Sequence, residues 1–150
     1  MTRPTKPPPA ALMSSPEDTE AQFYEALQQA DIDRLMSVWA DDDEVVCVHP
    51  GAGRVIGPAA IRASFEAIFA AGGVPAQPEQ VHRLHTMGTA VHHLVERIRV
   101  VTPEGEQNAW VLATNVFVKT AHGWRMVAHH ASPGSPHAPV VVGDAPAVLH

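Results

Sequence analysis

The sequence predicts a single α+β domain with helices on one side of a curved sheet. In the first half of the chain, apolar residues recur at helical spacing in three segments, interleaved with two short strand-like runs. In the second half, four longer segments rich in β-branched and aromatic residues are joined by short turns. Helices followed by consecutive strands are typical of an α+β domain with segregated layers.

Capping residues set the starts of the first two helices. Ser15 can cap the first, with a proline in the first turn and carboxylates near its positive end. Asp31 can cap the second, and a glycine pair can end the third. The expected elements are, in order, a helix after Ser15, a helix after Asp31, strands at 45–49 and 54–56, and a helix at 58–71.

The remaining elements are predicted to be antiparallel strands at 81–87, 90–101, 108–119 and 124–132. Side chains alternate between the two faces of a strand. Along 124–132, this alternation places Met126 and His130 on one face and His129 on the other. A histidine would then end a row of large apolar side chains, as expected where a hydrophobic pocket contains one polar group.

Composition limits the classes of partner and compartment. A length of 150 residues suits one domain, and the formal charge of −6 without a basic cluster argues against nucleic acid as a partner. No segment has the length and apolarity of a membrane span. Cys47 is the only cysteine, which agrees with a cytoplasmic location. Proline-rich tails, expected to be disordered, occupy 1–16 and 133–150, which leaves 17–132 as the folded domain.

Several short motifs occur in a characteristic order along the domain. They are Val38–Asp43, Val48–Gly51, Gly57–Arg62, Asn115–Phe117 and Gly123–Ser132. Together they resemble the nuclear-transport-factor-2-like superfamily, in its SnoaL-like and ketosteroid-isomerase-like branches. The resemblance implies a cone-shaped, cystatin-like roll in which a strongly curved sheet encloses an apolar cavity. It also implies a homodimer packed through the outer sheet face.

The resemblance locates candidate catalytic residues but does not choose an activity, because the same fold serves enzymes and pure binding modules. His49 is expected where ketosteroid-isomerase-like enzymes carry a carboxylate base, although an ungapped alignment from Trp39 places Cys47 there instead. A histidine titrates near neutral pH and could accept a proton. His130, expected in the cavity, could act as an acid or a positioning group.

Asn115 aligns with an acidic hydrogen-bond donor of the isomerases, and its amide can donate to an oxyanion without any pKa adjustment. The tyrosine that accompanies this donor in the family falls on Phe23, while Tyr24 would point about 100° away on the helix. The apolar wall of the cavity is expected to comprise Phe23, Trp39, Phe65, Phe69, Trp110, Leu112 and Met126.

Two functions follow from this site. The first is an isomerase, dehydratase or cyclase that transfers protons on a small apolar carbonyl compound. The second is a non-catalytic ligand-binding or dimerisation module. No cofactor is expected, and no metal site is expected either, because His82 and His85 should point to opposite faces of a strand. Arg97 and Arg99 lack matched aspartates, which excludes the epoxide-hydrolase branch.

Overall fold

The computed structural model describes residues 13–143, so the expectations for 1–12 and 144–150 lie outside it. One mixed sheet contains all the strands, in the order β2-β1-β6-β5-β4-β3, with β1 and β6 parallel and the other neighbours antiparallel. The elements are α2 (Pro16–Gln29), α3 (Ile32–Ser37), β1 (Val46–Val48), β2 (Arg54–Ile56), α4 (Pro58–Phe69), β3 (Ala76–Thr86), β4 (Thr89–Thr102), β5 (Gly105–Thr120) and β6 (Gly123–Ala131).

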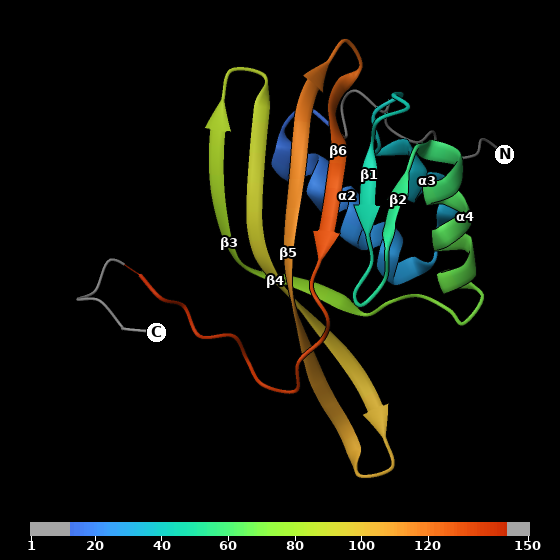
Figure 1. Ribbon diagram of the computed structural model, residues 1–150, viewed down its shortest axis with the longest axis vertical. Helices are drawn as coiled ribbons and strands as arrows, with labels where there is room; N and C mark the ends of the chain where they lie inside the picture. Colours follow the sequence, from blue (N-terminus) through green and yellow to red (C-terminus); the bar gives the residue numbers. More distant parts are fainter. Residues whose placement is uncertain (1–12, 144–150) are drawn as a thin grey trace, which may run out of the picture.

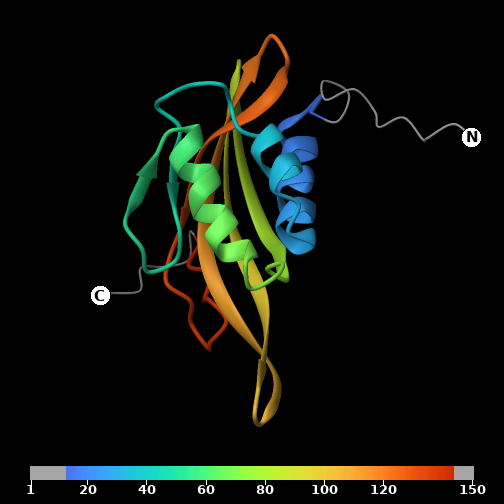
Figure 2. The same ribbon diagram turned by 90° about the vertical axis from the view of Figure 1, so that its right-hand side faces the viewer.

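The helices cover one face of the curved sheet, as predicted. In Figure 1, α2 lies behind β5 and β6, and the hairpin of β4 and β5 extends beyond the other elements. Figure 2 shows the helices on one side of the sheet and the segment after β6 on the other. We call the helix-covered face the inner face and the opposite one the outer face. Within residues 13–143, no helix is both long enough and apolar enough to cross a membrane.

The predicted helix caps are confirmed. Ser15 Oγ accepts a hydrogen bond from the Asp18 backbone N–H at 3.1 Å, and Asp31 Oδ1 accepts one from Arg34 N–H at 3.2 Å. Each bond satisfies a backbone donor that the first turn of a helix leaves free. Met13 is also buried in the core, and its carbonyl accepts the Trp124 N–H. Ordered packing therefore begins ahead of the predicted boundary at Glu17.

A β-bulge in β6 reverses the predicted orientation of the histidine pair. Val116 pairs with Ala128 but Phe117 pairs with Met126, so Val127 is an extra residue in the strand. An extra residue shifts the alternation of side chains by one. As a result Met126 and His129 are buried, and His130 is exposed on the outer face. The prediction that His130 lies in the cavity was wrong.

Trp110 and Leu112 also lie outside the predicted wall. Along β5, Val111, Ala113 and Asn115 are buried on the inner face, so the residues between them point outward. Leu112 is 54% exposed. Trp110 pairs with Ser135 in the segment that follows β6, through two backbone hydrogen bonds of 2.8 Å. These two side chains contribute to the outer face instead of the interior.

Candidate functional site

Most of the predicted site residues gather between the helices and the inner face of the sheet. The Phe65 ring packs edge-on against Phe23 and His49, with centroids 6.2 and 4.7 Å away. Phe23 in turn lies 4.9 Å from the His129 ring. Of the predicted wall residues, Phe23, Trp39, Phe65 and Met126 are in the core, and Phe69 packs against it.

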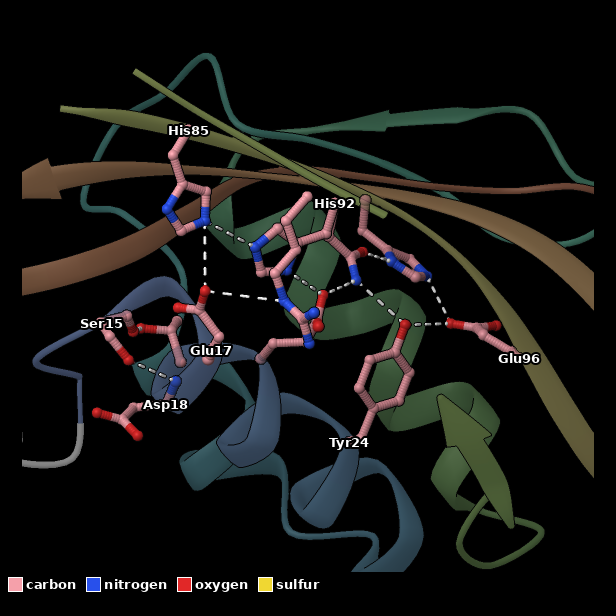
Figure 3. A network of polar contacts seen from close by, with 12 residues as sticks. Ser15, Glu17, Asp18, Tyr24, His85, His92 and Glu96 are labelled. Carbon is pink, nitrogen blue, oxygen red and sulfur yellow. Dashed lines mark hydrogen bonds and ion pairs between the residues drawn. The ribbon is translucent and has the colours of Figure 1, made fainter. Parts of the chain in front are cut away.

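Asn115 is the centre of a buried polar network, part of which is drawn in Figure 3. Its amide nitrogen donates to Glu20 Oε2 at 2.9 Å and to the Tyr24 hydroxyl oxygen at 3.1 Å. Its amide oxygen is 2.5 Å from Nδ1 of His129. Three elements, α2, β5 and β6, therefore meet at one side chain whose hydrogen-bonding groups are all engaged.

Glu96, on β4, extends this network and supplies an ionisable acid. The Tyr24 hydroxyl donates to Glu96 Oε2 at 2.8 Å (Figure 3). Glu96 is only 3% exposed, and this burial raises its pKa from 4.5 to about 7, despite the opposing effect of the Tyr24 hydrogen bond. Glu96 therefore changes its charge near neutral pH, which is the range that a general acid or base requires.

The hydrogen-bond pattern assigns the tautomer of His129. Because the Asn115 nitrogen donates to Glu20 and Tyr24, its oxygen must accept from Nδ1–H of His129. The lone pair then lies on Nε2, 3.8 Å from Glu96 Oε2. Burial lowers the pKa of His129 to about 4, so the ring is neutral at neutral pH.

His49 has the opposite tautomer. Ser64 donates its hydroxyl hydrogen to the Ile61 carbonyl at 2.7 Å, so it must accept from Nε2–H of His49 at 2.8 Å. The free lone pair of His49 is therefore on Nδ1. Burial lowers the pKa of His49, and nearby His129 adds to this effect. The neutral, proton-accepting form is therefore favoured at pH 7.

Cys47 is the alternative occupant of the base position. Its side chain is buried on β1, with Sγ 4.0 Å from Nδ1 of His49. Burial raises the pKa of the Cys47 thiol to about 12, and the charge of Glu96 contributes. A thiol that stays protonated at neutral pH is a poor base and a poor nucleophile, so the electrostatics favour His49.

Sequence reasoning missed Glu20, Tyr24, Glu96 and His129. Glu96 did carry a signal, because Ala90, Leu94 and Glu96 share one face of a strand, and a carboxylate on an apolar face is unusual. Tyr24 carried no such signal, because its side chain is about 100° away from Phe23 around the helix, which suggested that the two rings have separate environments. In the structure α2 is covered broadly enough for both rings to be buried, 5.0 Å apart.

Comparison with known proteins identifies the family. Residues 17–136 match the profile of the SnoaL-like domain. The chain belongs to this family. The predicted superfamily and fold are thus confirmed. An NTF2-like protein with a cystatin-like fold from Novosphingobium aromaticivorans superposes on this chain with a TM-score of 0.66 at 17% identity, over 77% of each chain. No curated protein matches the sequence.

Two other solved structures resemble this SnoaL-like protein more closely in sequence. One is a candidate calcium/calmodulin-dependent protein kinase type II association domain from Thiobacillus denitrificans, with 37% identity, coverage of 81% of this chain and 97% of that chain, and a TM-score of 0.74. The other is a candidate dehydratase of the NTF2-like family from Streptomyces avermitilis, with 31% identity, coverage of 77% and 90%, and a TM-score of 0.69.

Proposed function

We propose that this SnoaL-like protein is an isomerase, dehydratase or cyclase that transfers protons on a small apolar carbonyl compound. The observation that supports this most directly is Glu96, a buried carboxyl group with a pKa of about 7. A buried acid of this kind seldom serves packing alone, and Glu96 lies beside the Tyr24 hydroxyl and the neutral ring of His129.

Each polar group has a distinct role in this proposal. Nδ1 of His49 accepts the proton from the carbon next to the substrate carbonyl. Protonated Glu96 donates a hydrogen bond, or a proton, to the oxygen on which negative charge develops. Asn115 is the predicted oxyanion donor, but its amide hydrogens already bind Glu20 and Tyr24. It therefore supports Glu96 through Tyr24, as a positioning residue.

The substrate would enter beside α4, where His49 and Phe69 are only partly buried. Aromatic rings around this edge exclude water and favour an apolar substrate. The match to a candidate dehydratase at 31% identity is compatible with this chemistry.

The test is deuterium exchange at the carbon next to the carbonyl, followed by NMR in D₂O on a panel of small cyclic ketones. Wild-type protein should accelerate the exchange of at least one of them, and His49→Ala should reduce the rate by about 100-fold or more. His122→Ala is the matched control, because His122 is exposed in the turn between β5 and β6, and it should retain the wild-type rate. Equal rates for wild type and His49→Ala would refute the proposal.

The outer face supports a second function, a module that forms oligomers. An open groove of about 860 Å³ on this face is lined by Val48, Leu112, His130 and the apolar segment 139–142. Exposed apolar surface of this kind often marks an interface. The match at 37% identity to a candidate association domain agrees with this reading.

Analytical ultracentrifugation of wild type and Leu112→Glu tests the oligomer. If wild type is a dimer or larger and the variant is a monomer, the outer face is an interface between copies of this chain. A monomeric wild type would exclude this function. If wild type forms oligomers but accelerates deuterium exchange on none of the ketones, oligomer formation is the whole function.

A further inference from the structure

A second group of polar side chains lies at the surface end of the buried network. It consists of Glu17 in the first turn of α2, His85 on β3 and His92 on β4 (Figure 3). His85 is opposite Ala90 in the ladder, and His92 is opposite Arg83. The two histidines are thus diagonal neighbours on the inner face of one hairpin, although they are far from a metal-binding spacing in the sequence.

Two of the three distances in this group match those between the ligand atoms of one metal ion. Nε2 of His85 is 3.4 Å from Nε2 of His92 and 3.3 Å from Glu17 Oε1. All three ligand atoms lie within 4.8 Å of one another. In a tetrahedral zinc site with bonds of about 2.1 Å, ligand atoms are about 3.3 to 3.4 Å apart. Two of the three distances therefore equal those of such a site, and rotation of the exposed His85 and Glu17 side chains would bring the third atom into range and aim both imidazole nitrogens at one ion.

His92 is fully buried, and one of its ring nitrogens lies beside a carboxylate. Its Nδ1 is 3.0 Å from Glu20 Oε2, the distance of an ion pair, although the two groups are not aligned for a hydrogen bond. A carboxylate on one ring nitrogen favours the proton there and leaves the lone pair on the other nitrogen. Carboxylates occupy this place behind many metal-bound histidines.

We propose that Glu17, His85 and His92 bind one divalent transition-metal ion, with Zn²⁺ as the best match to two imidazoles and one carboxylate. Three protein ligands leave a fourth position for water. The ion would join the first turn of α2 to the β3–β4 hairpin. Because the side chains of Glu17 and His85 are 40% and 43% exposed, the ion can reach the site without unfolding of the domain.

Arg83 is the cation that competes for this site. Its Nε is 3.7 Å from Glu17 Oε1, on the same face of the hairpin. An arginine near a bound cation weakens binding through repulsion and through its claim on the shared carboxylate. Arg83→Gln should therefore increase the affinity for Zn²⁺ several-fold, an effect that a purely structural role of Glu17 would not produce.

The experiment is calorimetric titration of Zn²⁺ into the full chain after treatment with a chelator, together with the visible absorption spectrum of bound Co²⁺. Wild type should bind one ion per chain, with a four-coordinate Co²⁺ spectrum. His85→Ala and Glu17→Gln should each lower the affinity by about 100-fold or more. His82→Ala is the matched control, since His82 is directly opposite His93, away from the group, and should leave binding unchanged.

Both variants alter partly exposed side chains, so circular dichroism should show that the fold is retained. Three results would overturn the proposal: no Zn²⁺ binding by wild type, an equal loss in His82→Ala and His85→Ala, or a six-coordinate Co²⁺ spectrum. None of these readouts depends on catalysis, so this test is independent of the proposed enzyme function.

Discussion

Replacement of Glu96 by glutamine should make the protein more stable at alkaline pH and remove one source of its pH dependence. Glutamine keeps the shape of the side chain and can still accept the hydrogen bond from Tyr24, but it cannot ionise. The pKa of Glu96 rises from 4.5 to about 7 on folding because of burial. A group with a raised pKa contributes stability that is present below its unfolded pKa and is lost as the pH rises through the folded pKa.

The size of the effect follows from the same values. A change of one in a pKa corresponds to about 1.4 kcal/mol. A rise from 4.5 to about 7 therefore corresponds to about 3 kcal/mol. Wild type should lose this stability relative to Glu96→Gln as the pH rises from about 4.5 to 7, and the difference should stay constant above about pH 8.

Urea denaturation of both proteins at several pH values between 4.5 and 8.5 measures this difference. His129 titrates in the same range with the opposite sign, because its pKa is lowered to about 4. Comparison of the two proteins at each pH cancels most of that contribution. Parallel stability curves over the whole range would show that Glu96 is not the titrating group, and would remove the main support for proton transfer.

Three further substitutions test other parts of the structure. Tyr24→Phe removes the hydrogen bond that lowers the pKa of Glu96, so NMR titration should show a Glu96 pKa above its wild-type value. The variant should also lose about 1 to 2 kcal/mol in stability at pH 7. An unchanged Glu96 pKa would contradict the contact between Tyr24 and Glu96. Gly73→Ala places a Cβ atom 2.0 Å from the backbone oxygen of Gln28, so thermal unfolding should show that the free energy of unfolding falls by about 2 kcal/mol or more. A Tm equal to that of wild type would disprove the close approach of Gly73 to Gln28. Ser15→Ala removes the cap of α2 and should cost about 1 kcal/mol in urea denaturation, and no change would mean that water replaces the cap.

Local chemistry was enough to predict the order of elements and the helix starts. Ser15 and Asp31 cap their helices through contacts that span only three residues, so the information is present in the sequence itself. The hairpin of β5 and β6 was predicted for the same reason. The motifs around His49 and Asn115 pointed to the family. Asn115 is fully buried, and His49 is partly buried with its ring against Phe65.

The contents of the site depended on tertiary structure. The bulge at Val127 shifts one strand by a single residue, and this exchanges the positions of His129 and His130. A bulge is decided by pairing with β5, where Phe117 must face Met126, and no local pattern in β6 encodes it. Leu112 was misplaced for a related reason: both faces of β5 carry apolar residues, so periodicity alone could not show which one is covered by helices.

The sequence by itself determined the fold class, the caps and the family, because these depend on periodicity and on contacts between near neighbours. Only the tertiary structure decided which side chains share the interior. Glu20 reaches Asn115 across 95 residues of sequence, and Tyr24 reaches Glu96 across 72. Such pairs exist because α2 packs against the centre of the sheet, which brings together groups whose separation in the chain gives no indication of their distance in space.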